Sequence, residues 1–149
     1  MTTRFWLPLV GCLIASLSIA APVPKNKKGN PEEAIQGTWE VVDFDFGNRV
    51  AGAAKPRGPI GLHWTLDGDK LSMKQPNAVA GGNTATFKID TTQTPMQFEW
   101  NYNGNPTAIR AIFEIDGDTL KICYSGQRRP TELVAGNGTY MYTFKRVAK

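Results

Sequence analysis

Apolar residues recur at every second position through most of the chain from residue 60 onward. Such alternation predicts β-strands with one buried face, because successive side chains of a strand point to opposite sides. The alternating positions are Ile60, Leu62, Trp64 and Leu66; Ala85, Phe87 and Ile89; Met96, Phe98, Trp100 and Tyr102; Ile109, Ala111, Phe113 and Ile115; Leu120, Ile122 and Tyr124; and Tyr140, Tyr142 and Phe144. With residues 39–46 and 71–74 added, the pattern predicts about eight strands.

The connections between these segments carry turn residues. Residues 64–71 and 113–120 are nearly the same hairpin, and each turns on Asp-Gly, where a positive φ costs little. The acidic residues there are too few for a calcium loop, so we interpret them as turn formers. Residues 30–36 predict a single helical turn, capped by Asn30 with Pro31 at its first position. No later window is long enough for an amphipathic helix.

Eight consecutive antiparallel strands, each with one apolar face, must bury those faces in a sandwich or by closing into a barrel. Closure removes the exposed sheet edges, and the many aromatic residues on the alternating faces suit a barrel interior. We therefore predict an all-β fold, an antiparallel up-and-down barrel of about eight strands with one short N-terminal helical turn. Spacing alone does not decide whether the interior keeps a cavity.

The N-terminus carries an export pattern. Arg4 precedes an apolar stretch, and the small residues Ser18 and Ala20 then stand at the −3 and −1 positions of a cleavage site. Residues 1–20 are therefore a predicted signal peptide, which makes the protein periplasmic or secreted. The apolar stretch, about 16 residues, is shorter than the roughly 20 that a membrane span needs. In the alternative, residues 9–12 form a lipobox and Cys12 carries a lipid anchor, but the apolar stretch continues past Cys12.

Beyond the signal peptide, residues 21–30 predict a flexible basic linker and residues 31–149 the barrel domain. Cleavage removes Cys12 and leaves Cys123 alone, so no disulfide can form within the mature chain. We interpret Cys123 as a structural thiol, with catalysis or dimerisation through it as alternatives. Residues 47–59 form the longest loop, either a lid over the barrel or an excursion without ligand contact.

Composition narrows the function classes. The 149 residues hold 17 Lys and Arg against 13 Asp and Glu, a formal charge of +4 spread without long basic runs, which does not favour nucleic acid. A single histidine, His63, offers no recognisable metal or acid–base spacing, and no serine stands in a nucleophile elbow. We therefore expect no catalytic residues, metal or cofactor. Arginines 110, 128 and 129 with Lys121 are either a cationic rim or ordinary solvated residues.

Gln36-Gly37-Thr38-Trp39 resembles the Gly-x-Trp signature of lipocalins and their relatives. The resemblance implies that Trp39 plugs one end of the barrel under a basic side chain of the last strand, which Arg146 would supply through a cation–π contact. Together with residues 86–90, 116–124, 129–132 and 142–146, the chain resembles the uncharacterised planctomycete lipocalin-like domain family over about residues 33–147. The segments 47–59 and 77–83 depart from it. Members of this family are typically exported or attached to envelope proteins, and no activity or site can be carried over.

Two hypotheses follow for function. The leading one is an exported, noncatalytic barrel that binds a small, partly hydrophobic ligand in its interior, because apolar pockets with few polar groups are how such barrels bind. The residues predicted to line the interior are Trp64, Phe98, Trp100, Phe113 and Tyr142, and those predicted to be structural are Gly37, Trp39 and Arg146. The alternative is a cell-envelope interaction module, with a filled interior and a rim that docks a protein partner.

Overall fold

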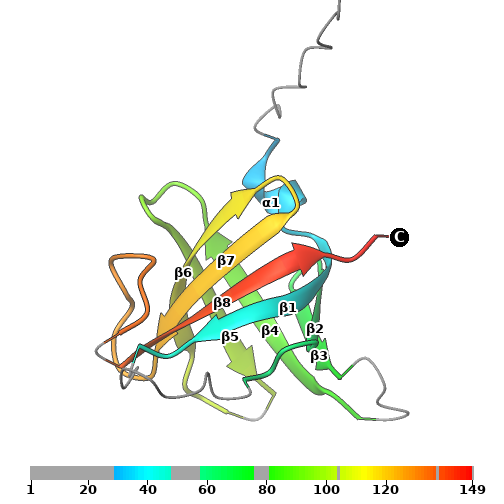
Figure 1. Cartoon of the computed structure of the whole chain (residues 1–149). Helices are drawn as coiled ribbons and strands as arrows, with labels where there is room; N and C mark the ends of the chain where they lie inside the picture. The colour runs from blue at the N-terminus through cyan, green and yellow to red at the C-terminus, as the bar shows by residue number, and fades with distance from the viewer. Residues whose placement is uncertain (1–28, 48–57, 76–80, 104, 137, 149) are drawn as a thin grey trace, which may run out of the picture.

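Eight antiparallel strands form a closed barrel in which each strand pairs with its neighbours in the sequence and the first pairs with the last (Figure 1). The computed structural model describes residues 29–47, 58–75, 81–103, 105–136 and 138–148. The elements are α1 (Pro31–Ala34), β1 (Gly37–Asp45), β2 (His63–Asp67), β3 (Lys70–Lys74), β4 (Asn83–Asp90), β5 (Met96–Tyr102), β6 (Ile109–Asp116), β7 (Thr119–Ser125) and β8 (Thr139–Arg146). The predicted all-β, up-and-down barrel with one helical turn is confirmed.

Several predictions from the sequence fall outside the described residues. They concern the signal peptide at residues 1–20, the lipid anchor at Cys12, and most of the linker at 21–30 and of the loop at 47–59. They stay predictions.

The turns follow the expected chemistry. Gly68 between β2 and β3 has φ +60°, and Gly117 between β6 and β7 has φ +55°, as the two Asp-Gly hairpins require. Asn30 caps α1, since its side-chain oxygen accepts from the backbone N–H of Glu32 at 3.1 Å. The prediction was wrong at Ile60, which is 51% exposed, because the chain turns there and β2 begins only at His63.

The helix end of the barrel, where α1 and the β2–β3 and β6–β7 hairpins lie, is closed by Trp39. Its indole Nε1 donates to the carbonyl of Ile35 at 2.8 Å. Arg146 lies over the ring, with its guanidinium carbon 4.1 Å from the ring centroid. Gly37 beside it has φ +117°, and a Cβ there would meet a guanidinium nitrogen of Arg146 at 3.1 Å. The contact expected from the lipocalin resemblance is present.

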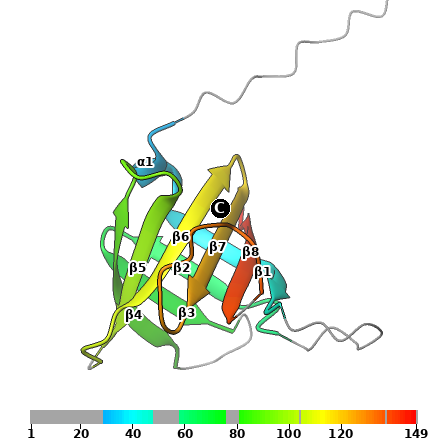
Figure 2. The same ribbon diagram turned by 90° about the vertical axis from the view of Figure 1, so that its left-hand side faces the viewer.

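A second, smaller packed layer lies outside the barrel wall. Ile112 and Cys123 pair with each other across β6 and β7, on the face opposite to Phe113 and Ile122, yet both are buried. Residues 126–136 of the connection between β7 and β8 run across β6 and β7 on this side (Figure 2, orange). The Cys123 thiol donates to the carbonyl of Val134 in this connection at 3.6 Å.

Arg129 fastens this connection to the barrel. Its guanidinium donates to a carboxylate oxygen of Glu99 on β5 at 2.9 Å and to the carbonyl of Ala111 on β6 at 3.4 Å. Arg110 lies 3.7 Å from the same oxygen of Glu99. Two of the arginines considered for a cationic rim are therefore paired with Glu99, and Arg129 has a structural role.

Candidate functional site

The end opposite α1, which we call the loop end, carries the longer connections β1–β2, β3–β4, β5–β6 and β7–β8. In an up-and-down barrel the hairpins alternate between the two ends. The tight turns after β2 and β6 lie at the helix end, so the longer connections gather at the other (Figure 1). Ligand sites of small barrels lie in such mouths, so the side chains that project inward near the loop end are the first candidates.

Trp64 on β2, Trp100 on β5, Tyr124 on β7 and Tyr142 on β8 converge in the interior toward the loop end. The Trp64 ring lies 5.6 Å from that of Trp100 and 5.4 Å from that of Tyr142, measured between centroids. Trp100 and Tyr124 are 5.4 Å apart, and Tyr124 and Tyr142 stack at 5.6 Å with 12° between their planes. Residues from four strands thus form one continuous aromatic cluster.

Two further rings extend this cluster to the surface at the loop end. Tyr140 stacks on Tyr124 at 5.1 Å and is 37% exposed, and Phe44 lies 4.8 Å from Tyr142. We call the six residues together the aromatic column: Phe44, Trp64, Trp100, Tyr124, Tyr140 and Tyr142. The column runs from two tryptophans with at most 2% exposure to a tyrosine at the rim. The column therefore connects a ring exposed at the loop end with two buried tryptophans through direct ring contacts.

The structure brings together three of the five predicted lining residues, Trp64, Trp100 and Tyr142. Phe98 lies below them, 5.6 Å from Trp100, and Phe113 lies 6.2 Å from Phe98. The register supports this placement, because Phe113 pairs with Met96, the first residue of β5 and the one farthest from the loop end. Phe98 and Phe113 thus form the floor of the site.

Phe44, Tyr124 and Tyr140 were not among the predicted lining residues. Tyr124 and Tyr140 were among the alternating positions, so their inward direction could be predicted. Phe44 could not, because β1 shifts register between Val41 and Asp43. After this bulge Phe44 pairs with Tyr142 and faces inward, whereas uninterrupted alternation from Trp39 would have pointed it outward.

The polar atoms of the site are few and not all are satisfied. Indole Nε1 of Trp64 and of Trp100 is buried, and neither donates to an acceptor among the described residues. Trp39 shows the usual arrangement, with its Nε1 bonded to the carbonyl of Ile35. An unpaired buried donor costs about 1–3 kcal/mol. The two indoles meet edge to face at 69°, and an N–H directed at a ring face is a weaker contact than one to oxygen.

The tyrosines beside these indoles are uncharged at neutral pH. Burial raises the pKa of Tyr124 far above its usual 10.0, helped by the neighbouring Tyr142 and by the hydrogen bond that the Tyr124 hydroxyl makes to Tyr142. Burial also raises the pKa of Tyr142, although that same hydrogen bond acts in the opposite direction. No charged residue is buried among the residues that the structure describes. The site is therefore aromatic and electrically neutral, with hydrogen-bond donors.

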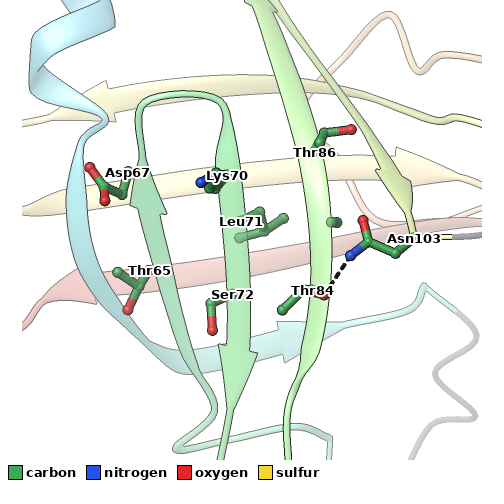
Figure 3. A pocket seen from close by; sticks show the side chains of 9 residues that line it. Thr65, Asp67, Lys70, Leu71, Ser72, Thr84, Thr86 and Asn103 are labelled. Carbon is green, nitrogen blue, oxygen red and sulfur yellow. Dashed lines mark hydrogen bonds between the residues drawn. The ribbon is translucent and has the colours of Figure 1, made fainter.

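A hollow of about 480 Å³ lies on the outer face of β2, β3 and β4 (Figure 3). Small hydroxylated residues line it, among them Thr65, Ser72 and Thr84. Asn103 donates to the Thr84 hydroxyl at 2.8 Å. The hollow was not predicted from the sequence, although Thr65, Ser72 and Thr84 are the polar positions of their strands. Among the described residues, it contains no buried donor without a partner, so it gives weaker grounds for a ligand than the two unpaired indole N–H groups of the interior.

Neither a scan against protein-family models nor a search of curated proteins gives a match to this chain.

Other chemistry has little support in the described ranges. No three His, Cys, Asp or Glu side chains in them come together as a metal site requires. His63 is the first residue of β2 and pairs with Lys74. Burial raises the pKa of the Cys123 thiol, which disfavours the nucleophilic thiolate. Within those ranges, too, no helix has the length and apolar character needed to cross a membrane.

Proposed function

We propose that this protein is an exported, noncatalytic barrel that binds a small, partly hydrophobic molecule in its interior at the loop end. The unpaired indole N–H groups of Trp64 and Trp100 carry this proposal. Export is supported by the signal-peptide pattern of residues 1–20, and the lipocalin-like character by the Gly37-Thr38-Trp39 opening with Arg146 over Trp39.

Burying the two indole N–H donors without acceptors costs free energy. In a barrel interior that served only as a packed core, each unpaired indole N–H would be a desolvation cost that an apolar side chain of the same shape would avoid. A ligand with an acceptor atom recovers this cost when it binds, and its apolar part gains contact with the rings of the aromatic column. The same residues thus supply both the affinity and the orientation of the ligand.

The proposal is tested with protein that begins at Ala21. The purified protein is incubated with an extract of lipids and pigments from its host, washed, and analysed by native mass spectrometry and by tryptophan fluorescence. We expect a retained small molecule and a change of fluorescence in the unaltered protein. The double variant Trp64→Phe/Trp100→Phe should retain less of that molecule. Native mass spectrometry measures this loss, because the two tryptophan reporters are absent from the variant. The matched control is Val134→Ser, which removes an apolar side chain that is 61% exposed on the outside and should leave binding unchanged.

Absence of binding would contradict the proposal. If no molecule is retained and the fluorescence ignores a panel of hydrophobic probes, the binding proposal is wrong, and the filled interaction module is the hypothesis that remains. Export is tested separately by the mass of the protein isolated from its host. An N-terminus at Ala21 supports the cleaved signal peptide, whereas an acylated Cys12 supports the lipid anchor.

A further inference from the structure

The hydrogen-bonding groups of the site indicate which kind of ligand it can take. The two free groups are donors, Nε1 of Trp64 and Nε1 of Trp100. An indole nitrogen can donate a hydrogen bond but cannot accept one. A ligand that satisfies both must therefore bring acceptor atoms, and the rings that carry the donors are adjacent, with centroids 5.6 Å apart. A carbonyl oxygen has two lone pairs and can accept from one or both of them.

The charges of the site exclude an ionic ligand from its interior. No charged residue is among the buried residues of the described chain, and Tyr124 and Tyr142 are neutral phenols there. An ion moved from water into such a site loses its hydration and finds no opposite charge among the described residues buried there, which costs several kcal/mol. A carboxylate or an ammonium group would therefore have to stay outside the loop end. The acceptor that reaches the tryptophans belongs to an uncharged group.

We infer that the ligand is an uncharged, largely apolar molecule with a carbonyl group, such as a ketone or a quinone, whose oxygen accepts hydrogen bonds from Trp64 and Trp100. This inference rests on the proposed function, because it names the chemical class of the molecule that the interior binds.

Three matched probes test it. Fluorene and 9-fluorenone have nearly the same shape and differ by one carbonyl group, and 9-fluorenone-2-carboxylate adds a charge. Binding is measured for each by quenching of tryptophan fluorescence. We expect fluorenone to bind about tenfold more tightly than fluorene, as one or two recovered hydrogen bonds would give. The carboxylate should bind more weakly than fluorenone.

Two further measurements connect the preference to the two tryptophans. In the variant Trp64→Phe/Trp100→Phe, fluorenone and fluorene should bind equally within about twofold, measured by calorimetry with thermal unfolding as the control for folding. If that variant does not fold, the infrared carbonyl stretch of fluorenone bound to the unaltered protein replaces it. A hydrogen-bonded carbonyl absorbs at lower wavenumber than the same ketone in an apolar solvent.

The outcomes separate this inference from the proposed function. Equal binding of fluorene and fluorenone, an unshifted carbonyl stretch, or undiminished binding of the carboxylate overturns the ligand class, while the proposal of an interior binder stands. A preference for fluorenone over fluorene that disappears in the double variant supports both. If neither fluorene nor fluorenone binds, the ligand class is overturned, and the experiment with the host extract decides the proposed function.

Discussion

Arg146, the last residue of β8, lies over the ring of Trp39 near the start of β1, 4.1 Å from the ring centroid. The same guanidinium donates to the carbonyl of Gln36 at 2.9 Å and to the carbonyl of Ala34. One side chain therefore joins the last strand, the plug residue of the helix end and the backbone that leads from α1 into β1. This combination holds the seam of the barrel, where β1 and β8 meet.

Replacing Arg146 by lysine should destabilise the barrel by about 2–4 kcal/mol, because lysine keeps the charge but not the fork that reaches two carbonyls and covers the ring. Urea unfolding followed by circular dichroism measures the change. Lys145→Met is the control. Lys145 is exposed, and among the described residues its ammonium group donates a hydrogen bond only to the hydroxyl of Thr119. It should change the free energy of unfolding by less than about 0.5 kcal/mol. Equal effects of the two substitutions would contradict the role assigned to Arg146.

The barrel itself could be predicted from alternation because each strand buries one face, and closure then follows from the need to cover the edges. The contact of Arg146 with Trp39 was predicted from the lipocalin resemblance, because residue spacing alone does not pair these two residues. Phe44 was hidden by the bulge in β1, which changes the face of every residue after it. A local register shift of this kind leaves no clear mark in a hydrophobic pattern.

The unpaired donors and the outer layer could not be predicted for a different reason. Alternation shows that Trp64 and Trp100 face inward, but whether an acceptor lies within reach depends on segments distant in the sequence. Likewise Cys123 stands at an outward position, where alternation predicts exposure. It is buried because residues 126–136 of the connection between β7 and β8 fold back over it.

The three described tryptophans should differ in what their N–H groups contribute to stability. Trp39→Phe removes a hydrogen bond to Ile35, whereas Trp64→Phe removes a donor that has no acceptor. Both rings are almost completely buried, so the loss of volume is similar. We expect Trp39→Phe to lower the free energy of unfolding by about 1–3 kcal/mol more than Trp64→Phe, measured by urea unfolding of the ligand-free protein. An equal loss would mean that the Trp64 N–H is bonded in solution.

The stability of the barrel should fall in alkaline solution. Burial raises the pKa of Tyr124 and Tyr142 above 10.0 in the folded state, whereas in the unfolded chain they ionise near 10.0. The folded state then holds more protons above that pH. The contribution of the protonated Tyr124 and Tyr142 hydroxyls to the free energy of unfolding is therefore complete below about pH 9. It is lost as the pH rises through 10 and beyond. Urea unfolding between pH 7 and 11 should show a shallower alkaline decline in Tyr124→Phe and Tyr142→Phe than in the unaltered protein.

The control for this experiment is Val134→Ser, which changes an exposed side chain on the outside of the barrel and removes no phenol. Its alkaline decline should match that of the unaltered protein. If all three variants behaved alike, the decline would come from groups outside the interior.

Arg129 should control access to Cys123. The thiol is buried under residues 126–136 of the connection between β7 and β8, its pKa is raised by that burial, and it donates to Val134, so iodoacetamide should label it slowly at pH 8. Arg129→Ala removes the hydrogen bonds to Glu99 and Ala111 that fasten the connection. The rate at which iodoacetamide labels Cys123, followed by mass spectrometry of the peptide that contains it, should then be about tenfold higher. A hydrogen bond to a charged group contributes enough free energy to shift the equilibrium of local opening by that factor.

Arg128→Ala, at the exposed neighbouring position, is the matched control and should leave the labelling rate unchanged. Fast labelling of the unaltered protein would show that the connection does not cover the thiol in solution, and the outer layer would then contribute little to the stability of β6 and β7.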